Sequence, residues 1–408
     1  MSITSFPKSK IEILLLENIH ESAVAEFKAA GYNNITRLHR SMSKKELAKE
    51  LTKTHILGIR SKTHIDQDTI SLAHKLLAIG CFCIGINQVD RINCAINGIS
   101  VFNSPYSNTR SVAELIIGEA ILLKRGVIHK NKAAHDGIWL KDAINSYELR
   151  GKTIGIIGYG HIGSQVSVLA ESLGMNVLYY DIVPKLPLGN ARACRSMKEV
   201  LEQADVLTFH VPDEANTYHL LNKKNILSVK KDAVILNLSR GNVVDLLAIS
   251  FALDQNLILG YGADVFPTEP DSTEPFECIL RNRHNVLLTP HIGGSTVEAQ
   301  ERTGIEVAHK LIQFLDAGCT MGSHSIPELS LPTQSGTHRI LHIHHNVPGV
   351  LSAITSVLSA HNINIAGQYL KTNEKIGYAV VDIEKTKNKE IINALEKISH
   401  TIKMRILY

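Results

Sequence analysis

The sequence contains few aromatic residues, little excess charge and no long apolar run. Phe, Trp and Tyr together make up 5% of the 408 residues, and Trp occurs once. Basic residues outnumber acidic ones by only 43 to 39 and form no long block, which argues against a nucleic-acid partner. No apolar run approaches the roughly 20 residues that span a bilayer, so we expect no membrane segment.

Cysteine is also scarce. The N-terminus carries no pattern of a cleavable leader. The cysteines form no CxxC pair and show no regular spacing. A reduced, cytoplasmic setting therefore fits best. The six residues are Cys81, Cys83, Cys94, Cys194, Cys278 and Cys319.

The length predicts two or three domains, because a single hydrophobic core rarely grows beyond about 300 residues. From Lys10 to about Ser104, strand-like runs such as IEILLLE and HILGIRS alternate with helical stretches, which is typical of a parallel α/β sheet. A long helical pattern then begins near Thr109 in NTRSVAELIIGEAILLKRG.

Six further apolar runs, separated by helices or loops, predict a second, doubly wound sheet. They are TIGIIG, NVLYYD, DVLTFHV, AVILNLS, LILGYGADV and NVLLTPH. A helical segment follows, and residues 318–336 are rich in Gly, Ser, Thr and Pro, as in a linker. Residues 337–408 then give the order βαββαβ.

The first run of the second sheet leads into GYGHIG, a GxGxxG motif at residues 158–163. Gly158, Gly160 and Gly163 permit a tight turn, close approach of a pyrophosphate and helix packing on the strand. Asp181 ends the next run, where a carboxylate binds the adenosine ribose and repels a 2′-phosphate. The pattern predicts NAD, and His210 either lines the adenosine pocket or is a surface histidine.

Four polar residues follow strands of this sheet, at the edge where ligands of parallel sheets collect. Oxidation of a hydroxyacid needs a base, a cation for the carboxylate and carbonyl oxygens, and a hydride acceptor. We assign His291 as the base, Arg240 as the cation and Glu269 as the carboxylate that orients the imidazole. Asp264 is expected to hold the nicotinamide end of the cofactor.

These residues complete a resemblance to the D-isomer-specific 2-hydroxyacid dehydrogenases. The motifs that carry the resemblance are GYGHIG, NLSRG, DVFPTEP and TPHIGGST. One branch of the family is indicated by three further features: CFCIGINQVD, FNSPYSNTRSVAEL and the terminal unit. That branch oxidises 3-phosphoglycerate to 3-phosphohydroxypyruvate with NAD, the first step of serine synthesis. The resemblance implies Arg240, Glu269 and His291 as catalytic residues. It implies further cofactor contacts at His161, Ile162, Leu238, Ser239, Asp264, Gly293 and Gly294.

The resemblance also implies the architecture. We expect an α/β chain in which a flavodoxin-like substrate-binding domain (1–108 and 295–317) holds an inserted Rossmann-type NAD-binding domain (109–294). A linker (318–336) leads to an ACT regulatory domain (337–408), and the assembly is a homotetramer.

The substrate carries a phosphate, which needs groups beyond Arg240. By resemblance, Arg60, Gly85 and Asn108 face the substrate, Ser61 stands beside Arg60, and Lys141 lies near the site. A solvated surface position is the alternative for Lys141.

The segment RILHIHHNVPGVL, residues 339–351, places three histidines before a Pro-Gly turn. In a strand, His342 and His344 share one face and His345 lies on the other. By resemblance, His344, Asn346 and Asn364 hold L-serine, which inhibits the enzyme. A metal site, or a polar loop that binds nothing, are the alternatives.

Two rival functions stay open from the sequence. One is a glyoxylate or hydroxypyruvate reductase of the same superfamily, which needs no phosphate on its substrate. The other is a non-catalytic NAD-sensing binding protein of this fold.

Overall fold

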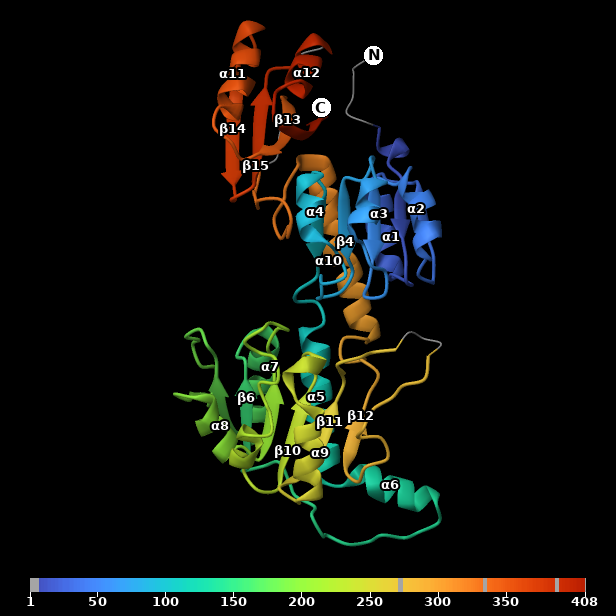
Figure 1. Cartoon of the computed structure of the whole chain (residues 1–408), viewed down its shortest axis with the longest axis vertical. Helices are drawn as coiled ribbons and strands as arrows, with labels where there is room; N and C mark the ends of the chain where they lie inside the picture. The colour runs from blue at the N-terminus through green and yellow to red at the C-terminus, as the bar shows by residue number, and fades with distance from the viewer. Residues whose placement is uncertain (1–6, 271–273, 333–335, 386–388, 408) are drawn as a thin grey trace. The chain divides into compact units, whose positions relative to one another are not determined.

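The computed structural model describes residues 7–270, 274–332, 336–385 and 389–407 (Figure 1). The chain divides into two compact units, one of Met1–Ser107 with Gln300–Tyr408 and one of Asn108–Ala299. In the part of the chain that is described, no helix is long and apolar enough to cross a membrane.

The first unit contains a five-stranded parallel sheet in the order β2-β1-β3-β4-β5. Phe314 and Leu311 of helix α10 pack against Leu15 and Phe27 in its core. The strand β2 was not predicted. Its side chains are partly buried or exposed, so its sequence contains no apolar run. The elements are η1 (Lys8–Lys10), β1 (Ile13–Leu15), α1 (Glu21–Ala29), β2 (Ile35–Arg37), α2 (Lys44–Leu51), β3 (Ile56–Ile59), α3 (Gln67–Ser71), β4 (Ala78–Cys81), α4 (Arg91–Ile96), β5 (Ser100–Asn103) and α10 (Val297–Ala317).

The second unit contains a seven-stranded parallel sheet in the order β12-β11-β10-β9-β6-β7-β8. Six of its strands are the predicted apolar runs, and β8 is an unpredicted strand of two residues. The elements are α5 (Thr109–Lys124), α6 (Val127–His135), β6 (Thr153–Ile157), α7 (His161–Ser172), β7 (Asn176–Tyr180), β8 (Arg192–Ala193), α8 (Met197–Gln203), β9 (Val206–Phe209), η2 (Asn225–Ser228), β10 (Ala233–Asn237), η3 (Gly241–Val243), α9 (Leu246–Asp254), β11 (Ile258–Ala263) and β12 (Val286–Leu288).

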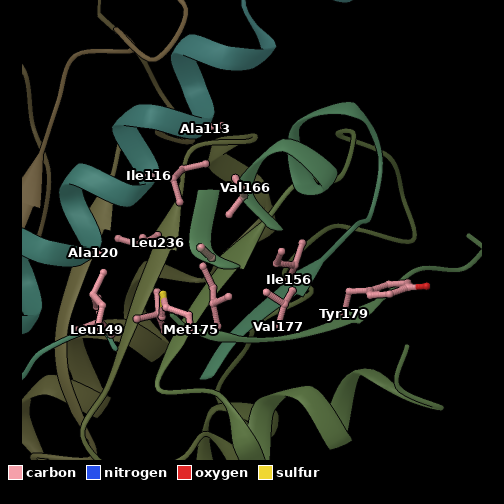
Figure 2. Close-up of a cluster of buried hydrophobic side chains, with 14 of the residues drawn as sticks. Ala113, Ile116, Ala120, Leu149, Ile156, Val166, Met175, Val177, Tyr179 and Leu236 are labelled. Atoms are coloured by element: carbon pink, nitrogen blue, oxygen red, sulfur yellow. The ribbon is translucent and has the colours of Figure 1, made fainter. Parts of the chain in front are cut away.

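One face of this sheet is covered by α5 and α7 (Figure 2). Ala113, Ile116 and Ala120 recur at helical spacing on α5 and meet Val166 of α7 and Leu236 of β10. Burial of such side chains contributes roughly 25 cal/mol per Å² of apolar surface, so this packing holds both helices against the sheet.

The C-terminal part of the first unit is an antiparallel sheet in the order β14-β15-β13-β16, with two helices on one face (Figure 1). Its elements confirm the predicted order βαββαβ: β13 (His338–His345), α11 (Val350–Ala360), β14 (Ile365–Thr372), β15 (Ile376–Ile383), α12 (Lys389–Glu396) and β16 (Thr401–Leu407).

Arg339 of β13 is fully buried and joins this sheet to the segment that precedes it. Its guanidinium donates to both carboxylate oxygens of Asp382 at 2.6 and 2.7 Å. The same group donates to the carbonyl oxygens of Ala317 and Pro332, each at 3.1 Å. The buried guanidinium of Arg339 therefore bonds the terminal domain to both ends of the segment between Ala317 and Pro332.

Residues 323–325 of the segment predicted as a linker pair with β5. The His324 amide donates to the Val101 carbonyl, and the Ser325 hydroxyl lies between the Val101 amide and the Ile99 carbonyl. Ser323 forms an antiparallel bridge with Phe102. Residues 333–335 of the predicted linker lie outside the described residues.

Candidate active site

In the glycine-rich turn after β6, packing within the protein leaves no room for a side chain at two of the three glycines. At the third, space for a side chain is present. A Cβ at Gly158 would lie 2.3 Å from the His210 carbonyl oxygen, and one at Gly163 would lie 2.3 Å from the Gly158 carbonyl oxygen. A Cβ at Gly160 would meet nothing within 4 Å. Packing does not require a glycine at this point, which fits close approach of a pyrophosphate to the backbone at the start of α7.

Asp181 stands at the end of β7, beside this turn. One of its oxygens accepts a hydrogen bond from the Tyr159 amide at 2.8 Å, and the other accepts from the Val183 amide at 2.9 Å. His210, at the end of β9, is held by a 3.1 Å contact between its Nε2 and the Thr208 hydroxyl. Burial lowers the pKa of His210 to about 3, so its imidazole is neutral. These residues fit the adenosine half of NAD.

Arg240 follows β10 and is held by a turn that Asn237 organises. The Asn237 amide donates to the Arg240 carbonyl at 3.0 Å and accepts from the Ser239 hydroxyl at 2.9 Å. Gly241 packs against the backbone of Phe266, where a Cβ would lie 2.0 Å from the carbonyl carbon. This close approach brings the Arg240 turn against the loop that carries Glu269.

His291 and Glu269 form a hydrogen-bonded pair, with 2.8 Å between Nδ1 and Oε2. The bond to Glu269 is the largest cause that raises the pKa of His291. Burial opposes the ionised form of Glu269, but its bond to His291 lowers its pKa overall. The charge of Arg240 acts on both groups, so the three side chains form one electrostatic site.

The backbone at His291 is in the left-handed region, with a φ of 54°. A residue other than glycine is uncommon there and is held by its surroundings. Asp264 supplies them: it accepts from the Thr289 hydroxyl at 2.6 Å and from the Ile292 and Gly293 amides, each at 2.7 Å. Asp264 therefore fixes the turn that presents the imidazole, and its predicted contact with nicotinamide stays a prediction.

Of the residues predicted to bind the substrate, Arg60 and Gly85 are brought together. Gln88 donates from its Nε2 to the Arg60 carbonyl at 2.7 Å and to the Gly85 carbonyl at 3.2 Å. Ser61, next to Arg60, is exposed. In the other unit, Asn108 lies against Gly294, and Lys141 is exposed in the segment after α6. Their contacts with substrate stay predictions.

The histidines of β13 lie as the strand periodicity predicts. His342 and His344 are buried on one face, with their Nδ1 atoms 3.4 Å apart, and His345 is exposed. Burial lowers the pKa of His342 to about 4. Asn346 and Asn364 are exposed, and the Asn346 amide donates to the Asn373 carbonyl at 2.7 Å. The described residues contain no group of three or more His, Cys, Asp or Glu that could hold a metal.

Sequence reasoning missed three residues that build the site: Asn237, Gln88 and Thr289. Asn237 lies within the NLSRG motif, so the motif itself carried that signal. Gln88 and Thr289 also lie within motifs, CFCIGINQVD and TPHIGGST, but they act on residues 28 and 25 positions away, and only the fold shows these pairings.

Two family models match the chain. The NAD binding domain of the D-isomer specific 2-hydroxyacid dehydrogenases matches residues 117–293. The ACT domain of the kind found in small subunits of AHAS matches residues 340–403.

Solved structures share the fold over three quarters of the chain. D-lactate dehydrogenase from Aquifex aeolicus, crystallised with NAD and lactic acid, is 24% identical with a TM-score of 0.68, over 78% of this chain and all of that one. A protein from Thermus thermophilus is 28% identical with a TM-score of 0.67, over 75% of this chain and 97% of that one.

The curated relatives match from end to end. D-3-phosphoglycerate dehydrogenase of Haemophilus influenzae is 49% identical over 99% of both chains. The proteins of the same name from Escherichia coli K12 and Dictyostelium discoideum are 48% and 47% identical over at least 99% of both chains. These matches confirm the resemblance, the fold class and NAD as the cofactor. The chain therefore belongs to the D-3-phosphoglycerate dehydrogenases, a branch of the D-isomer specific 2-hydroxyacid dehydrogenase family.

Proposed function

We propose that this chain catalyses the NAD-dependent oxidation of 3-phospho-D-glycerate to 3-phosphohydroxypyruvate, the first step of L-serine synthesis. The observation that carries the proposal is the 2.8 Å pair of His291 and Glu269 in the field of Arg240, at the strand ends of a sheet with a dinucleotide turn. The names of the relatives that match the chain over its full length support the same activity.

Each side chain of the site has a role in this reaction. The Nδ1–H of His291 donates to Glu269, which leaves Nε2 as the acceptor for the proton of the substrate hydroxyl. Arg240 binds the carboxylate with its planar fork and faces the carbonyl oxygen that develops. When bound at the GYGHIG turn, NAD supplies the acceptor for the hydride. In the reverse direction, the His291 imidazolium returns the proton.

The test follows NADH absorbance with purified protein and 3-phosphohydroxypyruvate, with hydroxypyruvate and glyoxylate as rival substrates. His291→Asn is the informative variant, because Asn tolerates the left-handed backbone. We expect it to bind NADH and lose turnover. The control His309→Asn removes a similar imidazole, 2.8 Å from Glu26 in the other unit of the chain, and should stay active.

Other outcomes of this assay contradict the proposal in different ways. Equal turnover of the substrates without phosphate would favour the 2-oxo acid reductase. NADH binding without turnover of any substrate would favour the sensing protein.

We further propose that L-serine binds at His344, Asn346 and Asn364 between paired ACT domains and inhibits the enzyme. Serine must then have different affinities in the active and inactive arrangements. In the same assay, serine should lower the rate of the wild type and leave Asn346→Ala unaffected. A wild-type rate that is independent of serine would contradict the regulatory site and leave the enzymatic proposal intact.

The proposed assembly is a homotetramer. Support comes from the segment after α6, where Ile138, Trp139 and Ile144 are 54%, 84% and 75% exposed. Apolar side chains at this exposure fit a contact with a second copy. The six cysteines all lie in the described residues and none forms a disulfide, which fits a reducing compartment such as the cytoplasm. Light scattering of the purified protein tests the subunit number.

A further inference from the structure

Glu119, on helix α5, is a fully buried acid that the proposed mechanism does not use. Its side chain is 0% exposed, and neither carboxyl oxygen has a hydrogen-bond partner within the described part of the chain. The other acids in the cores differ: Glu17 accepts from two backbone amides, and Asp264 and Asp382 accept from several donors. A buried polar group without a partner calls for an explanation.

The carboxyl group of Glu119 lies against β11, close to the end of that strand. A Cβ at Gly262, two residues before Asp264 in β11, would lie 2.7 Å from its Oε2. Burial and, after it, the charge of Asp264 raise the pKa of Glu119 to about 8, and the Thr289 hydroxyl also acts on this carboxyl group. Glu119 thus stands next to both members of the hydrogen bond that holds the His291 turn.

The hydrogen-bonding capacity of Thr289 determines whether Glu119 interacts favourably with it as a neutral carboxylic acid or as a carboxylate. The single hydroxyl proton of Thr289 is donated to Asp264. The hydroxyl can then offer Glu119 only a lone pair, so a favourable interaction requires Glu119 to be the donor. A protonated carboxyl can donate, whereas a carboxylate can only accept.

We propose that Glu119 is a positioning residue that works as a neutral carboxylic acid: by directing its proton toward Thr289, it supports the Asp264 turn that presents His291. This inference rests on the proposed function, since it assigns Glu119 to the same site.

Loss of the Glu119 proton would act on this turn. The ionisable and polar groups that interact electrostatically with Glu119 are Asp264 after β11, Tyr261 in β11 and Thr289 after β12. They are an acid, a phenol and a hydroxyl, so a second carboxylate would meet repulsion from Asp264 and the lone pairs of Thr289. The bonds from Ile292 and Gly293 to Asp264 would weaken, and His291 would lose its position.

The kinetic test compares Glu119→Gln, which keeps the shape and the donor, with Glu114→Gln on the exposed face of the same helix. The kcat/KM for 3-phosphohydroxypyruvate is measured from about pH 6 to about pH 10. Wild type and Glu114→Gln lose two protons, from His291 and Glu119, so activity should fall about a hundredfold per pH unit at the alkaline end. Glu119→Gln should fall only about tenfold per unit. An alkaline limb that is the same in all three proteins would overturn the proposal.

A direct test does not depend on activity. Difference infrared spectra of the full-length wild type should show a protonated carboxyl band that disappears near pH 8 and is absent from Glu119→Gln. In Thr289→Val the band should disappear at lower pH, because the protonated carboxyl then lacks its acceptor. A Glu119 that titrates in the ordinary range of carboxyl groups would refute the inference. If the band titrates as expected and the enzyme does not turn over 3-phosphohydroxypyruvate, the proposed function fails and the protonated Glu119 stands.

Discussion

Replacing Glu269 with Gln should move the alkaline limb of reduction and the acid limb of oxidation to lower pH. The bond from Glu269 is the largest cause of the raised pKa of His291, so its loss lowers that pKa. Reduction needs the imidazolium and occurs below this pKa, so its alkaline limb moves to lower pH. Oxidation needs the neutral ring and occurs above it, so its acid limb also moves to lower pH.

The magnitude follows from the geometry of the pair. Hydrogen bonds to charged groups contribute about 1.5–3 kcal/mol. The side chains of His291 and Glu269 are 51% and 40% exposed, and solvent screening reduces the contribution to about 1 kcal/mol. Above the pKa of His291, reductive kcat/KM should therefore fall about fivefold beyond any loss seen at acid pH.

The assay records kcat/KM against pH for 3-phosphohydroxypyruvate with NADH and for 3-phosphoglycerate with NAD. The matched control is Glu26→Gln, which removes the same bond from His309 at the same 2.8 Å distance, outside the site. Profiles of Glu269→Gln that fall in parallel, with both limbs in place, would refute the reasoning.

Three further substitutions test the cation, the cofactor site and the terminal domain. Arg240→Lys should lower kcat/KM about a hundredfold, because a point charge replaces the fork; unchanged kinetics would contradict its role. Asp181→Asn should lower the preference for NAD over NADP about tenfold, measured as the ratio of kcat/KM values, and a constant ratio would contradict ribose recognition. Arg339→Met should cost about 3–5 kcal/mol in local stability, because Asp382 stays buried without its partner. Hydrogen exchange should then quicken in β13 and β15, and exchange as slow as in wild type would contradict this.

Most strands of the second sheet could be predicted because parallel strands buried on both faces read as continuous apolar runs. The strands β2 and β8 could not, since their side chains are partly or fully exposed and leave no such run. The positions of Arg240, Glu269 and His291 followed from the rule that ligands collect at the strand ends.

The supporting contacts of the site were beyond sequence reasoning, because they join residues that are far apart along the chain. The bond from Thr289 to Asp264 spans 25 positions, and the proximity of Glu119 to β11 depends on how a helix packs on the sheet. The composition of residues 318–332 gave no sign of their contacts with the sheet: Ser323 bonds with Ser100, and Ser325 bonds with Val101 of β5.

The pairing of residues 323–325 with β5 determines where the chain can be shortened. β5 is the last strand of its sheet, and a bare strand edge is a template for aggregation. A truncation after Pro332 removes the ACT domain and keeps this edge covered. A truncation before Ser323 uncovers the Val101 amide and carbonyl and invites edge-to-edge association between copies. Fragments made to study catalysis without the ACT domain should therefore retain the whole of the segment beside β5.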